Sequence, residues 1–205
     1  MKYKLKRWEV ALLTGFAVAL LMGAWLDREQ AALADRVIRL HVIANSDSEA
    51  DQELKYQVRD RILTEAAALY QPGDGLQQVR RSMEDNLAML ARAGREVVEE
   101  QGYDYPVSAS LERTWFPTKK YTDFALPAGN YTALRIVVGE GRGENWWCVA
   151  FPPLCLGSVS ETVDEAAAAG NFTPEQVSLI TGESGGYVIK FKAIELWEEF
   201  KKMWE

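Results

Sequence analysis

The spacing of apolar residues changes once, from a period of two to a helical period, between residues 37 and 69. Residues 37–44 alternate: one set is Ile38, Leu40, Val42 and Ala44, and the other is Val37, Arg39, His41 and Ile43. A period of two predicts a β-strand with one buried face. From residue 50 onward, apolar side chains recur every three or four positions, which predicts an amphipathic helix directly after the strand.

A polar run at residues 45–48 separates this strand from the helix. Short polar side chains such as Asn, Ser and Asp hydrogen-bond the free backbone N–H groups of a helix start. Ser46 with Glu49 fits a capping box, and Ser48 with Asp51 offers a second register for it. A helix N-terminus can also bind a phosphate. The run has no glycine, and Asp47, Glu49 and Asp51 would repel a phosphate, so we favour self-capping over anion binding.

The remaining pattern predicts one more helix and then several strands. An apolar stripe from Leu76 to Val97 predicts a helix that ends at Gly102. Alternating or β-rich runs predict strands at 107–116, 119–126, 131–138 and 146–151. The glycine-rich segment 139–145 lacks the ending of a phosphate loop and precedes a strand, which favours a hairpin loop. The expected fold class is α+β, with a mostly antiparallel sheet packed against two long amphipathic helices.

The N-terminal residues have the layout of an export segment. Basic residues at positions 2–7 precede an uncharged apolar run from Val10 to Leu26. This order is typical of a signal peptide or of an N-terminal signal anchor that remains as a membrane helix, and a 17-residue run fits both. Ala32-Leu33-Ala34 has the small–x–small form that signal peptidases cut. We therefore divide the chain into an export segment (1–34), an α+β domain (35–157) and a helical C-terminal extension (158–205).

Two features define the predicted C-terminal extension. Thr173-Pro174 marks a helix start, with proline at the first helical position. An aromatic stripe on a terminal helix is formed by Ile194, Trp197, Phe200, Met203 and Trp204. Such a helix docks on a core or binds a partner or a membrane surface, and we favour docking.

Composition and charge narrow the classes of function. Apolar residues make up 48% of the chain, with seven Trp, which indicates a folded core. Beyond the first nine residues, 19 basic and 29 acidic residues leave a net charge near −10, which disfavours nucleic acids and anionic lipid headgroups. The single histidine, His41, lies near no second metal ligand and no nucleophile motif. We therefore expect no catalytic residue, no metal, no cofactor and no small-molecule ligand.

Both cysteines fall in the part of the chain that would be exported. Cys148 and Cys155 flank Pro152-Pro153, which can bend the chain enough to bring their Cα atoms within bridging range. An oxidising compartment favours a disulfide between them. Two buried free thiols remain an equal alternative, because cysteine is among the most buried residue types.

Two long motifs resemble the stage II sporulation protein R family of endospore-forming bacteria. They are IRLHVIANSDSEADQELKYQVRD (Ile38–Asp60) and LPAGNYTALRIVVGEGRGENWWCVAFPPLC (Leu126–Cys155), and they follow a single N-terminal apolar segment as in that family. The resemblance implies a protein made in the forespore and exported into the space between the two membranes. There it would activate a membrane-embedded aspartic protease, stage II sporulation protein GA, which cleaves the sigma-E precursor. The resemblance supplies no catalytic residues.

A signalling ligand needs a contact surface, and we expect that surface to carry polar, Arg and aromatic residues. The candidates are Arg39, His41, Asn45, Ser46, Asp47, Arg142, Asn145, Trp146 and Trp147. At most one of the two tryptophans is expected to be available, because the other would face the core of a two-sided strand. One alternative is an extracytoplasmic hydrolase of cell wall or peptide that uses His41 with Asp47 or a nearby acid. Another is a purely structural envelope protein.

Overall fold

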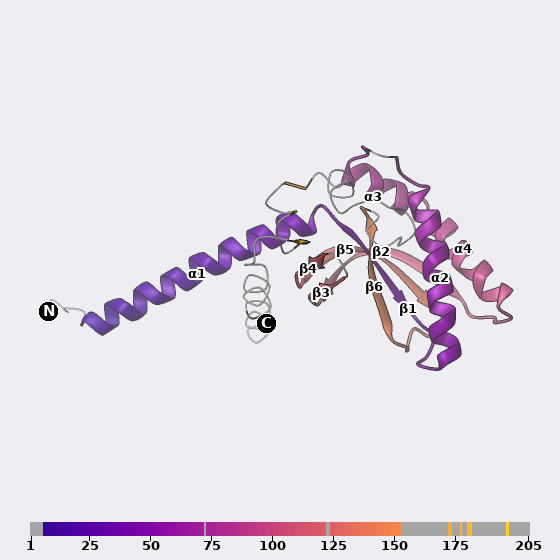
Figure 1. Cartoon of the computed structure of the whole chain (residues 1–205), viewed down its shortest axis with the longest axis horizontal. Helices are drawn as coiled ribbons and strands as arrows, with labels where there is room; N and C mark the ends of the chain where they lie inside the picture. The colour runs from indigo at the N-terminus through magenta and orange to yellow at the C-terminus, as the bar shows by residue number, and fades with distance from the viewer. Residues whose placement is uncertain are drawn as a thin grey trace.

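The computed structural model describes residues 6–71, 73–121, 124–152, 172–173, 177, 180–181 and 196. It begins with one long helix, α1 (Arg7–Ala34), which projects from the body of the molecule (Figure 1). The part of α1 from Arg7 to Trp25 is long and apolar enough to cross a membrane. This confirms the N-terminal apolar helix, which suits a signal peptide or a membrane anchor.

The body of the molecule contains a four-stranded mixed sheet in the order β2-β5-β1-β6. Its strands are β1 (Ile38–Ile43), β2 (Val107–Phe116), β5 (Gly129–Val138) and β6 (Asn145–Phe151). β1 is central and pairs parallel with β5 but antiparallel with β6, while β2 pairs antiparallel with β5. The α+β class is confirmed, and the sheet combines two antiparallel pairings with one parallel pairing.

The predicted strand at 119–126 is instead a small separate hairpin. β3 (Lys119–Lys120) and β4 (Ala125–Leu126) pair only with each other among the described residues. Tyr121 N–H donates to the carbonyl of Phe124 at 2.8 Å and closes the turn between the two strands. We call residues 119–126 the β3–β4 hairpin.

Three helices cover one face of the sheet, which we call the first face (Figure 1). They are α2 (Glu49–Ala67), α3 (Leu76–Asp85) and α4 (Leu87–Glu100). The predicted second long helix is therefore wrong, because it is split at Asn86. The Asn86 side chain donates to the carbonyl of Ser82 at 2.8 Å, a local bond by which asparagine competes with the helical ladder. The expected end at Gly102 is confirmed by its φ of +81° and by the Tyr103 N–H bond to the Val98 carbonyl.

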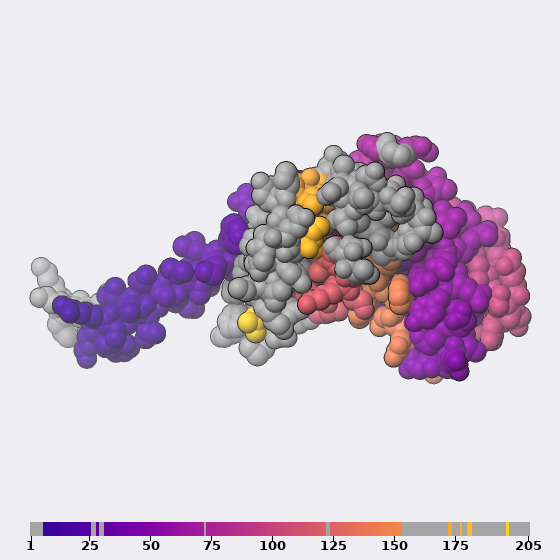
Figure 2. Space-filling model, viewed as in Figure 1, coloured from indigo at the N-terminus to yellow at the C-terminus, as the bar shows by residue number. Residues whose placement is uncertain are grey.

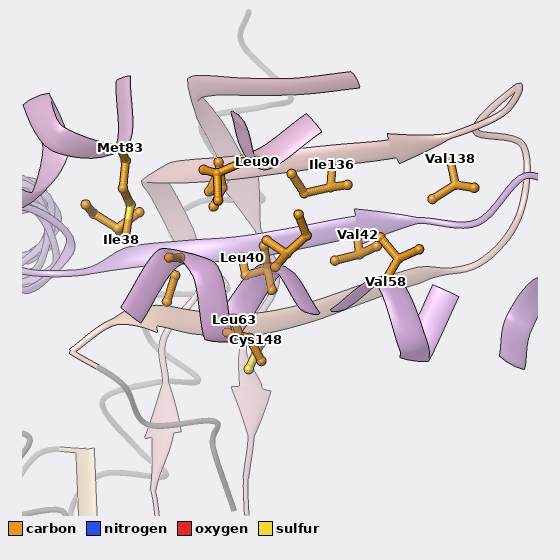
Figure 3. Close-up of a cluster of buried hydrophobic side chains, with 14 of the residues drawn as sticks. Ile38, Leu40, Val42, Val58, Leu63, Met83, Leu90, Ile136, Val138 and Cys148 are labelled. Carbon is orange, nitrogen blue, oxygen red and sulfur yellow. The ribbon is translucent and has the colours of Figure 1, made fainter. Parts of the chain in front are cut away.

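The main core lies between the first face and these helices (Figure 3). Alternate residues of β1, namely Ile38, Leu40 and Val42, point into it and are fully buried. Side chains from α2, α3 and α4, among them Val58, Met83 and Leu90, meet them there. The predicted orientation of this half of the strand is confirmed.

The opposite face of the sheet, the second face, is also covered over part of its area. Its buried cluster joins the end of α1 and the residue just before β1, the β3–β4 hairpin, inward residues of the sheet and one residue of the C-terminal part: Leu33, Ala34, Val37, Phe116, Phe124, Leu126, Tyr131, Ala133, Val149 and Ile180. Every residue of β1 is consequently buried. The prediction of a strand with one buried face is wrong, because β1 is central and both of its faces are packed.

The features predicted for the C-terminal part lie almost entirely outside the described residues. These include the Thr173-Pro174 helix start, the terminal aromatic helix and Cys155. Among the described positions, Ile180 is 1% exposed and belongs to the second-face cluster. The boundary between residues 157 and 158 remains a prediction.

Candidate functional site

The polar turn after β1 is stabilised by its own side chains. Ser48 is the N-cap of α2 and accepts a hydrogen bond from Asp51 N–H at 3.2 Å, so the second predicted capping register is the one adopted. Asp51 is 5% exposed and accepts hydrogen bonds from the Asn45 amide and the Ser46 hydroxyl. Burial alone would raise the pKa of the Asp51 carboxyl, but hydrogen bonds from Ser46, Asn45 and Ser48 outweigh it and lower the pKa.

The glycine-rich segment 139–144 folds against this turn. The Asn45 side-chain oxygen accepts from Glu140 N–H at 3.0 Å, and its backbone carbonyl accepts from Arg142 N–H at 3.1 Å. Asp47 Oδ1 accepts from Glu144 N–H at 2.7 Å. We call the unit formed by residues 44–49 and 139–145 the tip.

The tip overturns the prediction of a hairpin loop. β5 and β6 do not pair with each other, because β1 lies between them. The loop crosses the end of β1 instead, close enough that a Cβ atom on Gly143 would stand 2.2 Å from the Ser46 carbonyl oxygen. Glycine is required there by that backbone approach. The glycines were visible in the sequence, but the strand inserted between β5 and β6 was not.

A buried lysine supports the tip from beneath. Lys55 of α2 is 1% exposed, and its ammonium donates to the Gln52 side chain and, at 3.2 Å, to the Glu144 carbonyl. Gln52 in turn donates to the Ser46 carbonyl at 2.9 Å. Burial lowers the pKa of Lys55. Sequence reasoning missed this residue and named Asp51 only as a capping residue, although both fall on the buried stripe of α2 at a spacing of four.

His41 lies just below the tip on the second face and is 8% exposed. Its Nε2 is hydrogen-bonded to Asn145 Oδ1 at 2.7 Å, and its ring packs against Phe116 and Trp147. Burial lowers the pKa of His41 and outweighs the hydrogen bond to Asn145, which raises it. The dyad with Asp47 that the hydrolase alternative needs is not formed, since Asp47 is engaged by the Glu144 backbone. Among the described residues, no group of His, Cys, Asp and Glu could hold a metal ion.

Arg39 is a correction to the predicted surface, because it is fully buried. Its guanidinium carbon stands 4.1 Å from the ring centre of Phe116 and 5.0 Å from that of Tyr131. Nη2 donates to the Tyr121 hydroxyl at 3.1 Å, while Nε and Nη1 have no hydrogen-bond partner among the described residues. Its burial follows from the β3–β4 hairpin, which covers this part of the second face.

The two tryptophans of β6 lie on opposite faces of the sheet and are both half-buried. Trp146 packs edge-on against Tyr56 of α2, and the Arg59 guanidinium lies 4.8 Å from its ring centre. Trp147 lies beside His41 on the second face, with the Lys119 ammonium 6.0 Å from its ring. Each tryptophan therefore keeps part of its surface accessible.

The exposed charge of the tip is predominantly acidic. Four of its carboxylates are exposed, on Asp47, Glu49, Glu140 and Glu144. Arg142 is the basic residue among them, 77% exposed and 3.1 Å from the Glu140 carboxylate. Of the nine predicted contact residues, five lie in the tip: Asn45, Ser46, Asp47, Arg142 and Asn145. The half-buried Trp146 and Trp147 adjoin it, whereas His41 and Arg39 are buried, so their predicted place on the surface is wrong. Cys148 is 3% exposed in β6 and is disulfide-bonded, while Cys155, its predicted partner, lies outside the described residues.

Comparison with known proteins places this fold and its tip in a family. The family model described as stage II sporulation protein R matches residues 34–161, well over half of the chain. The chain belongs to the stage II sporulation protein R family. It is 36% identical over 130 residues to the stage II sporulation protein R of Bacillus subtilis (strain 168), a match that covers 63% of this chain and 58% of that relative. No solved structure matches.

The family match includes every tip residue, His41 and both tryptophans of β6. It begins at the last residue of α1, so the apolar part of that helix precedes the matched region. A role in sporulation follows from membership of the stage II sporulation protein R family.

Proposed function

We propose that this protein is an exported sporulation signal that activates stage II sporulation protein GA, a membrane-embedded aspartic protease. The activated protease would process the sigma-E precursor and so link gene expression in the forespore to that in the mother cell. The protein would act as a ligand in the space between the two membranes. Family membership and the N-terminal apolar helix support this proposal.

The observation that carries the proposal is the tip. Its loop is held to the turn by backbone bonds to the Asn45 amide oxygen, the Asn45 carbonyl and the Asp47 carboxylate. A surface ordered in this way before binding loses little entropy when a partner docks. Its exposed carboxylates would attract a basic surface on the partner and fix the docking orientation. The half-buried Trp146 and Trp147 beside it are residue types that anchor protein interfaces.

Reversal of tip charge tests the proposal. The protein, the protease and the sigma-E precursor would be produced together in a non-sporulating host, with precursor cleavage as the readout. Glu140→Arg with Glu144→Arg should lower cleavage roughly tenfold or more, because like charges would then face each other across the interface. Both side chains are exposed, so the fold should be unaffected.

A matched control places the same charge change elsewhere. Glu84→Arg with Asp85→Arg alters two exposed acidic residues of α3, away from the tip, and should leave cleavage unchanged. Equal cleavage by both double variants, at equal protein abundance, would remove the tip as the contact surface. No cleavage with the wild-type protein would overturn the proposed function, and a purely structural envelope role would then be favoured.

A further inference from the structure

The last turn of α1 is part of the folded domain. Leu33 and Ala34 are fully buried in the second-face cluster. The chain then turns directly into β1, with Arg36 N–H bonded to the Leu33 carbonyl at 3.0 Å. Asp35 at the end of the helix forms an ion pair with Arg113 of β2 at 3.0 Å. α1 therefore ends inside the domain core, without a linker between helix and strand.

The rest of α1 has the opposite character. Leu12, Phe16 and Leu21 are 64%, 65% and 73% exposed, and apolar side chains surround the helix. Figure 2 shows this part as a rod that projects from the body. An exposed apolar surface of this extent requires a cover, and its length and composition suit the hydrocarbon of a bilayer.

These two halves are one uninterrupted helix of 28 residues. We propose that α1 is retained in the mature protein as a membrane anchor and that its buried last turn fixes the domain with the tip facing away from that membrane. Cleavage after Ala34, the small–x–small site, would remove Leu33 and Ala34 from a cluster in which both are fully buried. The core thus depends on residues that a cleaved signal peptide would take away.

The direction follows from the path of the chain. The start of α1 and the turn that follows β1 lie at opposite ends of the molecule (Figure 1). Ala34 follows Leu26 by eight helical steps, about 12 Å at a rise of about 1.5 Å each, and the six residues of β1 add about 20 Å. The tip would stand roughly 30 Å from the anchoring bilayer if the two axes were aligned. It would then meet a partner held in the opposing membrane, and this last step rests on the proposed function.

The mature N-terminus tests retention. The full-length protein would be produced in a bacterial host with an active signal peptidase, its membranes washed with alkaline carbonate, and its intact mass measured. We expect a membrane-bound chain that still contains residues 10–34. A soluble mature chain that begins at Asp35, or any mature form without the apolar run, would overturn the proposal.

A pair of leucine substitutions tests the buried turn separately. Leu33→Ala in the full-length protein should lower the melting temperature by roughly 5–10 °C, because it opens a cavity in a closed cluster. Leu13→Ala removes the same atoms from a side chain that is 58% exposed, and should change the melting temperature of the domain by about 1 °C or less. Equal small shifts would show that the last turn does not belong to the core.

Fluorescence quenching tests the direction. A fluorescent amino acid would be placed at Arg36 in one sample and at Glu140 in another, with the protein in lipid nanodiscs that carry headgroup quenchers. The label at position 36 should be quenched strongly and the label at 140 weakly. Equal or reversed quenching would overturn the orientation. None of these measurements involves the protease, so they succeed or fail independently of the proposed function.

Discussion

The two faces of β1 differ in chemistry although they alternate along one six-residue strand. The first face presents Ile38, Leu40 and Val42 to the helices, where each is fully buried among apolar side chains. The second face presents Arg39 and His41, which are buried nearly as completely. Arg39 Nε and Nη1 and His41 Nδ1 have no hydrogen-bond partner among the described residues.

The apolar residues of the first face are expected to raise the free energy of unfolding, whereas Arg39 and His41 on the second face are expected to lower it. Burial of apolar area is favourable, at about 25 cal/mol per Å². Burial of a charge without a counter-ion is unfavourable by several kcal/mol in proteins. The second face therefore carries groups that stability alone does not explain, and one of them, His41, lies beside the tip. Substitution of Leu40 on the first face and of Arg39 on the second face should therefore change the free energy of unfolding with opposite signs.

The largest effect is expected on the first face. Leu40→Ala would remove a fully buried side chain from the main core. It should lower the free energy of unfolding by about 3 kcal/mol, through lost transfer energy and a residual cavity. Urea denaturation followed by tryptophan fluorescence measures this value. A loss below about 1 kcal/mol would show that the helix layer collapses into the space, and the contrast between the faces would weaken.

A smaller effect, with the opposite sign, is expected for Arg39. Arg39→Met keeps a long side chain against Phe116 and Tyr131 and removes a charge that has no counter-ion among the described residues. The substitution loses one hydrogen bond to the Tyr121 hydroxyl and the contacts of the guanidinium with the two rings. Because removal of the buried charge should outweigh these losses, the unfolding free energy should rise by about 1–2 kcal/mol. The same urea titration gives the comparison with Leu40→Ala.

Arg39→Lys is the matched control for that prediction. It retains the positive charge but has no planar group to lie over the Phe116 ring, so it should not stabilise the protein. The opposite result for Arg39→Met would be a fall in the unfolding free energy of more than about 1 kcal/mol, which is the usual effect of a destabilising substitution. That result would show that the guanidinium stabilises the fold. The two faces would then contribute to stability in the same direction.

Local sequence pattern predicted the first face correctly, because it depends on neighbours along the chain. The switch from strand to helix period, the Ser48 cap and the end at Gly102 each involve residues within a few positions. The split at Asn86 was missed, since the same apolar stripe continues through α3 and α4. A single asparagine bonded to the preceding turn interrupts the helix without changing the apolar spacing.

Features that depend on distant segments were not predictable in this way. The burial of Arg39 requires the β3–β4 hairpin, which lies far from it in sequence. The path of residues 139–144 across the end of β1 requires β1 to lie between β5 and β6. Alternation shows which side a residue faces but not whether that side is covered. The structure brings five of the candidate residues together at the tip, whose role as a contact surface stays a prediction, whereas Arg39 and His41 are buried.

The smallest expected effect is a pH dependence from His41. Burial lowers its pKa in the folded protein below the value in the unfolded chain. Between these two pKa values the unfolded chain binds more protons, so stability rises with pH. The stabilisation from neutral His41 is thus present above the unfolded pKa, near 6.5, and is lost as pH falls toward the folded pKa.

His41→Gln isolates this contribution. Its unfolding free energy should fall less steeply than that of the wild type as pH is lowered from 7 to 5, a window about the ordinary histidine pKa. The difference between the two profiles cancels the contributions of the titratable groups that both proteins share. Parallel profiles would mean that protonated His41 is accommodated on the second face. That face would then accommodate a positive charge at both Arg39 and His41, and the buried charge of Arg39 would not lower the stability of the fold.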